Sequence, residues 1–348
     1  MTRSSPTNRR PTMRDIAALA GVSPGTVSRV LNGRPGVGDD TRERVEGIIA
    51  REGFQANASA QWLSTGRSRS IGIVFPFHTS ELVLHPIYPL LFGALGDAAE
   101  AAGYDVMLLN VSSPEKVGRL LDVISRRRVD GVVLPASGAH DPLVRKLLPL
   151  GTPVVVIGHR VRADGVGWVD SSHDVAAHEI TRSLIHSGRR HLTLLNGPST
   201  ISACRLRASG FWKAVKEAGN SVKTANEYEV LFETDATVEA ATRILSAKKD
   251  RPDAIIGGND LIASGCIDAA RSLGLDVPAD VAVSGFDDRS LASHTNPALT
   301  TVRMPLQDIG HTAAQMLFAM IDGAPPGKRH VVLPTQVIWR DSTPANAS

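Results

Sequence analysis

Residues 12–32 read TMRDIAALAGVSPGTVSRVLN, and this stretch decides the fold of the amino-terminal part of the chain. Ile16, Leu19 and Ala20 recur at helical spacing and predict a first helix with one buried apolar face. The next residue is a glycine, which turns the chain at least cost. Ser23 followed by a proline is typical of the start of a second helix. Two short helices joined by a glycine turn indicate a helix-turn-helix, whose second helix enters the major groove of DNA.

The second helix has an apolar and a polar face. Val27, Val30 and Leu31 follow the i, i+3, i+4 spacing of an inner face. Small or flat polar side chains on the other face allow close approach to base edges, and an arginine there can reach a phosphate or a guanine. An ordinary surface helical hairpin is the alternative interpretation. The outward positions are Gly25, Thr26, Ser28, Arg29 and Asn32.

Charge favours the DNA-binding interpretation. Residues 1–70 contain 11 Arg, no Lys and 6 acidic residues, a net charge of +5, whereas the whole 348-residue chain carries +3. The remainder, with 27 basic and 29 acidic residues, is therefore at −2. A third helix is predicted over residues 39–53, with acids in its first turn and a glycine at its end. Positive charge thus gathers where phosphates would be bound.

The order of these motifs resembles the lactose-repressor (LacI) family of bacterial transcription regulators. The matching segments are MRDIA (13–17), AGVS (20–23), TVSRVLN (26–32) and TRERV (41–45). NASAQWL (57–63) is similar to the family's hinge helix, which implies that Leu63 wedges into the minor groove with Ala60 packed nearby. The chain departs from the family at Ala56, where proline is usual, and at Gly38, where a serine usually caps the third helix. The expected DNA-contacting residues are Thr12, Ser23, Pro24, Gly25, Thr26, Ser28, Arg29, Asn32, Asn57, Ala60 and Leu63.

From Ser70 onward, apolar runs alternate with amphipathic helical patterns, for example over 88–102, 174–187, 205–218 and 260–273. Repeated β–α units of this length predict parallel sheets covered on both faces, and the length predicts two lobes. The resemblance implies the periplasmic-binding-protein-like fold, with two Rossmann-like lobes and an effector in the cleft between them. The fold class is therefore α/β, preceded by a small all-α domain. The predicted strands are 71–75, 104–109, 131–134, 154–157, 191–195, 254–256 and 281–284.

Polar residues follow several of these strands, where ligands bind in open parallel sheets. Asn259 and Asp287 follow two predicted strands, and Arg205 and Arg207 open a helix. An amide, a carboxylate and a guanidinium suit the hydroxyls of a sugar. The resemblance implies that Asn259, Asp287 and Arg205 contact the effector, with Arg207 a weaker candidate and His85 a further one on a long first loop. The alternative, compatible with binding, is that Asn259-Asp260 and Asp287-Asp288 cap the following helices. Trp168 either stacks on a sugar or fills the core.

The sequence gives little support for metal binding, disulfide bonds, catalysis or membrane insertion. The histidines at 173, 178, 186 and 191 do not share a helix face, so a zinc site is not expected. Cys204 and Cys266 are isolated and fit free thiols in a reducing compartment. Phosphate-binding glycine loops, a nucleophile elbow, a long apolar segment and a secretory signal are all missing from the sequence. A periplasmic-type sugar-binding protein and a Rossmann-like enzyme remain the alternatives. We expect no enzyme activity, cofactor, metal or membrane association.

The predicted organisation has five parts. They are a disordered basic arm (1–11), a helix-turn-helix domain (12–56), a hinge helix and linker (57–69), a two-lobed effector-binding and dimerisation domain (70–341) and a disordered tail (342–348). We expect a cytoplasmic, nucleoid-associated repressor that binds a pseudo-palindromic double-stranded operator as a homodimer. Helices 88–102 and 305–321 are expected to form dimer contacts. A carbohydrate effector, acting by induction, is expected to control it.

Overall fold

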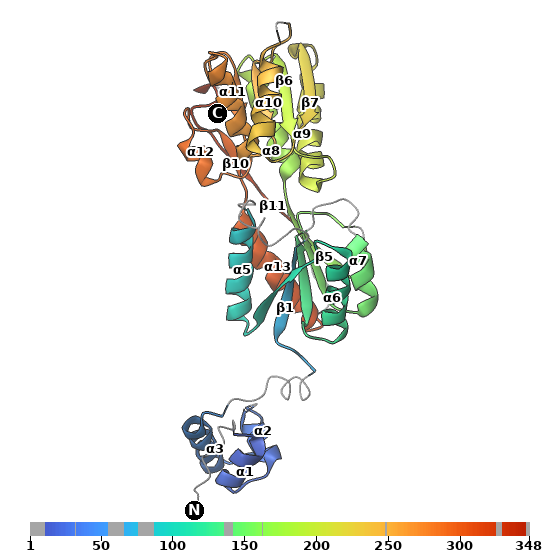
Figure 1. Ribbon diagram of the computed structural model, residues 1–348, viewed down its shortest axis with the longest axis vertical. Helices are drawn as coiled ribbons and strands as arrows, with labels where there is room; N and C mark the ends of the chain where they lie inside the picture. Colours follow the sequence, from blue (N-terminus) through green and yellow to red (C-terminus); the bar gives the residue numbers. More distant parts are fainter. Residues whose placement is uncertain are drawn as a thin grey trace, which may run out of the picture. The chain divides into compact units, whose positions relative to one another are not determined.

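The computed structural model describes residues 11–31, 33–54, 66–75, 87–135, 142–161, 163–247, 249–324 and 329–345. The chain divides into two compact units, Met1–Ser68 and Arg69–Ser348. Their placement relative to each other is not determined, so each is treated by itself (Figure 1). The predictions for Asn32, Asn57, Ala60, Leu63 and His85 lie outside the described residues.

The first unit contains the helices α1 (Met13–Ala20), α2 (Pro24–Leu31) and α3 (Asp39–Glu52). Their inner faces form a small core around Ile16, Val27 and Val45, which are fully buried. The prediction for Leu19 was wrong, because this side chain is 55% exposed and Ala17 is buried in its place. Ile16, Ala17 and Ala20 fill the i, i+1, i+4 positions of the inner face, which turns Leu19 toward solvent.

Local capping sets the helix ends of this unit. Thr12 and Asp15 form a capping box at the start of α1, and Gly21 ends that helix with a φ of +64°. At the start of α2, the Thr26 N–H donates to Ser23 Oγ at 3.1 Å. Gly38 begins α3 without a side-chain hydrogen bond, as its lack of a side chain requires. The helix-turn-helix geometry therefore follows from short-range sequence signals.

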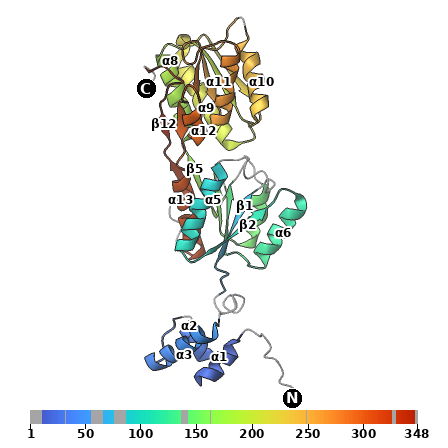
Figure 2. The ribbon, with the colours of Figure 1, turned by 60° about the vertical axis from the view of Figure 1, so that its left-hand side comes forward.

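The second unit contains two parallel sheets, each covered by helices on both faces (Figure 1; Figure 2). The first lobe has a six-stranded sheet in the order β11-β5-β4-β3-β1-β2. Helices α5 and α13 pack on one face of this sheet, and α6 and α7 pack on the other. The elements are β1 (Ser70–Phe75), α5 (Ile87–Ala101), β2 (Asp105–Asn110), α6 (Pro114–Ser125), β3 (Gly131–Pro135), α7 (Pro142–Leu147), β4 (Val154–Ile157), β5 (Val166–Ser171), α13 (Leu306–Ile321) and β11 (His330–Leu333).

The second lobe has a four-stranded sheet in the order β7-β6-β8-β9. Helices α8 and α9 cover one face and α10 and α11 the other. The approach of α8 to α9 is close, since a Cβ at Gly210 would lie 2.1 Å from the Asp174 carbonyl oxygen. The elements are α8 (His173–His186), β6 (His191–Asn196), α9 (Ser202–Ala218), β7 (Thr224–Glu229), α10 (Thr234–Leu245), β8 (Ala254–Gly257), α11 (Asp260–Ser272), β9 (Ala282–Ser284) and α12 (Ser290–His294).

The chain passes between the lobes at three places within the described residues. One passage joins β5 to α8. The second runs through β10 (Thr301–Arg303) into α13, and the third leads from β11 into β12 (Gln336–Ile338). Strands β10 and β12 pair antiparallel, so two of the connecting segments are hydrogen-bonded to each other. Each strand predicted from the sequence corresponds to a strand of the two parallel sheets, with ends that differ by a residue or two.

The end of the chain differs from the expectation of a disordered tail beginning at residue 342. Ser342 and Thr343 are buried in the second lobe. Ser342 Oγ donates to the Val283 carbonyl at 2.6 Å, and its N–H donates to the Ala298 carbonyl at 2.9 Å. The bond to Val283 attaches the segment to β9, so the packed domain extends past residue 341. Across the described ranges, no helix has the length and apolar character needed to cross a membrane.

Candidate nucleic-acid interface and ligand site

Helix α2 presents a polar surface above a buried apolar one. Val27 and Val30 are buried in the three-helix core, which fixes the rotation of the helix. Ser23, Pro24, Gly25 and Arg29 are exposed, and Thr26 and Ser28 are half-buried. Every described position expected to face outward on this helix therefore reaches the surface. Small side chains at its amino-terminal end leave room for close approach to a groove.

Thr12 has a structural task at the start of α1. Its backbone N–H and its Oγ1 both donate to Asp15 Oδ2, each at 2.7 Å. Asp15 offsets the positive end of α1, whereas the exposed amino-terminal end of α2, at Ser23, Pro24 and Gly25, carries partial positive charge that favours phosphate contact.

The excess positive charge of residues 1–70 belongs to the flanking segments. Residues 12–54 contain six Arg and six acidic residues, so the three-helix body is neutral. Arg3, Arg9 and Arg10 precede it, and Arg67 and Arg69 follow it. Phosphate contact must therefore rely on how the arginines of the body are placed, Arg29 among them, and on the two flanking segments.

Arg207 is the centre of the polar cluster at the carboxyl ends of the strands in the second lobe. It lies on α9, is buried, and stacks over the ring of Phe286 with its guanidinium carbon 4.3 Å from the ring centroid. Its Nη2 lies 3.5 Å from Asp287 Oδ1, and its Nη1 donates to the Gly258 carbonyl. Burial raises the pKa of Asp287, and the positive charge of Arg207 opposes that rise. A buried guanidinium beside a carboxylate can hold two hydroxyls of one ligand.

Two of the other predicted ligand residues have local partners. Asn259 Oδ1 accepts the Ile262 N–H at 2.8 Å, so this residue caps α11, as the alternative interpretation held. Arg205 is half-buried, and its Nη1 donates to the Ser199 carbonyl at 2.6 Å. Asp287 and Asp288 do not cap α12, which starts after Arg289 without a side-chain bond. The structure therefore brings Arg207, rather than Arg205, to Asp287.

Sequence reasoning missed a second layer around Arg207. His173 Nδ1 lies 3.4 Å from Arg207 Nη2, and its Nε2 lies 3.2 Å from Ser171 Oγ. Burial, together with the charges of Arg207 and Arg160, lowers the pKa of His173 well below its usual value, so the imidazole is neutral. No local sequence pattern indicates this role, because His173 meets Arg207 only through the packing of α8 on α9.

Asp170 extends this layer toward the first lobe. It is buried at the end of β5, and its Oδ2 accepts the Arg160 Nε–H at 2.9 Å. Burial raises the pKa of Asp170 despite the nearby Arg160. The other Oδ atom has no hydrogen-bond partner among the described residues.

The remaining candidates are accounted for by local contacts. Trp168 lies on β5 and stacks on His330, with ring centroids 4.8 Å apart, while packing against the first lobe's core. Three other histidines were considered as metal ligands. His178 Nε2 lies 2.5 Å from Glu217 Oε2, and His191 Nδ1 lies 2.9 Å from Thr224 Oγ1. His186 contacts the carbonyl of Arg182 at 2.7 Å. These histidines are dispersed over separate partners.

Two families match the chain. Residues 12–57 match the family described as bacterial regulatory proteins, lacI family, and residues 181–343 match a periplasmic binding protein-like domain. The HTH-type transcriptional regulator CelR of Thermobifida fusca is 32% identical over 96% of this chain and 98% of its own length. A structure of a CelR–cellobiose complex superposes with a TM-score of 0.71 at 30% identity, covering 96% of this chain and 100% of that one. The lac repressor dimer bound to operator and the anti-inducer ONPF superposes with a TM-score of 0.81 at 26% identity, covering 97% and 100%.

Proposed function

Because the chain belongs to the LacI family of bacterial regulatory proteins, we propose that it is a sequence-specific transcriptional repressor controlled by a small carbohydrate. The observation that carries the DNA-binding half is α2, whose Val27 and Val30 are buried while Ser23 to Arg29 offer a polar surface. One short helix reads too few base pairs for specificity, so two copies bind a pseudo-palindromic operator. The related lac repressor was solved as a dimer on its operator, which supports this arrangement.

The proposed DNA contacts combine the described helix with the segments on either side. From the described residues they are Thr12, Ser23, Pro24, Gly25, Thr26, Ser28 and Arg29. The further proposed DNA contacts, which lie outside the residues that the structure describes, are Asn32, Asn57, Ala60 and Leu63. Leu63 is the proposed wedge, whose insertion costs a few kcal/mol of base unstacking and is offset by contacts that the bent DNA allows. This function places the protein in the cytoplasm, where chromosomal DNA lies.

The proposed effector site is the cluster at the strand ends of the second lobe. Arg207 and Asp287 are its central pair, since their side chains meet at 3.5 Å in a largely buried setting. Asn259, Arg205 and His85 are the further proposed contacts. CelR was solved with cellobiose and the lac repressor with ONPG, which supports a glycoside as the ligand class. Binding without turnover is proposed, because the relatives are regulators.

The two sites are thermodynamically linked. If the effector changes operator affinity by some factor, the operator changes effector affinity by the same factor, typically corresponding to about 1–3 kcal/mol. We propose induction, in which the sugar weakens operator binding.

The test selects operators from a randomised duplex library with the full-length protein. A thermal-shift screen then compares cellobiose, maltose, lactose and D-ribose. We expect one enriched palindromic sequence and at least one stabilising sugar, recovered chemically unchanged, that weakens operator binding. Asp287→Ala is expected to remove the sugar response and spare operator binding. A library that shows no enrichment would refute the DNA-binding half. An enriched operator with an unaltered sugar response in Asp287→Ala would move the effector site elsewhere.

A further inference from the structure

Two adjacent aspartates after β9 adopt backbone conformations that side chains rarely adopt. Asp287 has a φ of +102° and Asp288 a φ of +49°. Non-glycine residues at positive φ cost free energy and persist where surrounding contacts hold them, often at functional sites. This turn gives the two carboxylates different partners. Asp287 lies beside Arg207 at the proposed effector site, whereas Asp288 contacts Arg303 and Arg340.

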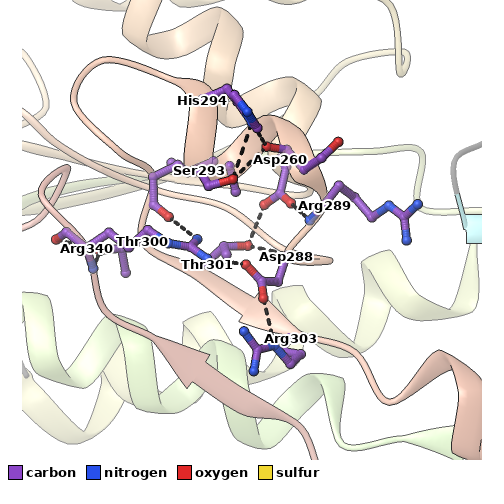
Figure 3. Close-up of polar contacts among 12 residues, drawn as sticks. Asp260, Asp288, Arg289, Ser293, His294, Thr300, Thr301, Arg303 and Arg340 are labelled. Atoms are coloured by element: carbon purple, nitrogen blue, oxygen red, sulfur yellow. Dashed lines mark hydrogen bonds and ion pairs between the residues drawn. The ribbon is translucent and has the colours of Figure 1, made fainter.

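The carboxylate of Asp288 is held by two arginines (Figure 3). Arg303 Nε donates to Asp288 Oδ2 at 2.7 Å, and Arg340 Nη2 donates to Oδ1 at 2.6 Å. The Asp288 side chain is only 7% exposed. Burial opposes its ionisation, but the hydrogen bonds and charges of Arg340 and Arg303 together hold the pKa of Asp288 below its usual value. The ion triad therefore stays charged under physiological conditions.

Both arginines belong to the segments that join the two lobes. Arg303 is the last residue of β10, which leads into α13 of the first lobe, and Arg340 follows β12, which arrives from β11. Arg340 is fixed further by its backbone N–H, which donates to Thr300 Oγ1 at 2.8 Å. The carboxylate of Asp288 therefore links the end of β10 to the segment that follows β12, two of the segments that join the lobes.

The same turn is joined to β10 through its backbone. The Asp287 N–H donates to the Val302 carbonyl at 2.8 Å. Asp260, at the start of α11, accepts the Arg289 N–H at 2.7 Å and the Thr301 hydroxyl proton (Figure 3). A displacement of Asp287 by a ligand therefore cannot occur without moving β10 or breaking these bonds.

We propose that Asp288 is the positioning residue that couples the effector site to the connecting strands, through the Arg303–Asp288–Arg340 ion triad. This inference rests on the proposed function for its sugar and its operator. Asp287 senses the ligand, and Asp288 carries the resulting displacement of the turn to both connecting segments, which set the geometry of the lobes. A ligand can shift such an equilibrium only through interactions that differ between the two states, and this triad supplies one.

The variant Asp288→Asn isolates the charge. Asparagine tolerates the left-handed backbone at least as well as aspartate, so the turn itself should persist. Asp268→Asn is the matched control, because it removes an exposed ion pair with Arg271 in the same lobe. Circular dichroism and thermal unfolding establish that both variants fold. Arg303→Gln provides a second variant should Asp288→Asn fail to fold, since that side chain is 55% exposed.

The first measurement needs no ligand. Spin labels are placed at Glu100→Cys on α5 and Lys213→Cys on α9, both exposed, in full-length protein diluted into unlabelled protein. Pulsed electron–electron double resonance then gives the distribution of distances between the two spin labels, one on each lobe. We expect the distribution of Asp288→Asn, or of Arg303→Gln in its place, to be at least twice as wide as that of Asp268→Asn. Equal widths would overturn the proposal.

The second measurement quantifies coupling. Cellobiose, maltose, lactose and D-ribose are titrated with and without the selected operator. In Asp288→Asn, we expect the sugar Kd without operator to stay within threefold of the unmodified protein, while the ratio of the two Kd values falls at least tenfold toward one. A merely structural role would change the Kd and leave that ratio intact, which would refute the proposal. If none of the four sugars binds the unmodified protein, the sugar part of the proposed function fails, and the distance measurement decides this inference alone.

Discussion

Replacing Asp260 by asparagine should stabilise the second lobe above neutral pH. Asp260 is 2% exposed, and burial, together with the negative charges of Asp287 and Asp288, raises its pKa to about 7 from an ordinary value of 3.8. Its hydrogen bonds are compatible with an amide. The new Oδ1 can accept the Arg289 N–H, and the new amide group can donate to Thr301 Oγ1.

The magnitude follows from proton linkage. Between about pH 4 and pH 7, the native state keeps a proton on Asp260 that the unfolded state has lost. A raised native pKa of this kind makes the free energy of unfolding fall as pH rises, by about 1.4 kcal/mol per pH unit. Over this interval the loss reaches roughly 4 kcal/mol, a large part of the roughly 5–15 kcal/mol typical of a native protein. An asparagine at this position has no titrating proton, so the variant avoids this loss.

The assay is urea unfolding followed by tryptophan fluorescence, because Trp212 lies in the same lobe. The free energies of unfolding of Asp260→Asn and the unmodified protein are compared between about pH 4.5 and pH 8. We expect their difference to grow with pH in favour of Asp260→Asn and to level off above about pH 7. Asp268→Asn, on the same helix, is the control. A difference that stays constant across this pH range would refute the reasoning.

Three further substitutions test other parts of the molecule. Ser23→Ala removes the acceptor of the Thr26 N–H, so the free energy of unfolding of the first unit, measured by thermal unfolding, should fall by about 1 kcal/mol. Operator binding should weaken as well, and unchanged stability would contradict the capping role of Ser23. Arg29→Ala should weaken operator binding by about 1–3 kcal/mol in fluorescence anisotropy, and an unaltered affinity would remove this residue from the interface. Gly210→Ala places a Cβ against the Asp174 carbonyl and should cost about 1–3 kcal/mol in urea unfolding, whereas a neutral effect would mean that α8 and α9 separate freely.

Much of the fold could be predicted because its signals are local. The glycine turn, the Ser23 cap and the apolar spacing of Val27 and Val30 are all set within one or two helical turns. Likewise, buried parallel strands appear as short apolar runs, as at 154–157 and 254–256. Sequence order therefore indicated both the helix-turn-helix and the two-lobed α/β domain.

The remainder depends on contacts between distant segments. Strand β11 pairs with β5 across more than 150 residues, and α13 joins the first lobe only after the parallel sheet of the second lobe is complete, so neither placement has a local signal. The edge strand β7 was not predicted from the sequence, because its residues are mostly polar and partly exposed and give no apolar run. The exposure of Leu19 and the burial of Ser342 were likewise decided by tertiary packing.

The candidate site shows the same division. Asn259 and Asp287 could be located because they follow predicted strands. The resemblance favoured Arg205 over Arg207, but both open the same helix, and only packing on Phe286 buries Arg207 beside Asp287. His173 and Asp288 acquire their roles from partners on other elements, and the sequence offers no spacing that would reveal them.

The most direct test of the account is binding of the full-length protein to its selected operator and to a shuffled duplex, measured by fluorescence anisotropy at several salt concentrations. We expect two chains per operator, an affinity at least about a thousandfold above that for the shuffled duplex, and a logarithm of affinity that falls linearly with the logarithm of salt concentration. Equal affinity for the two duplexes across the salt range would contradict the account.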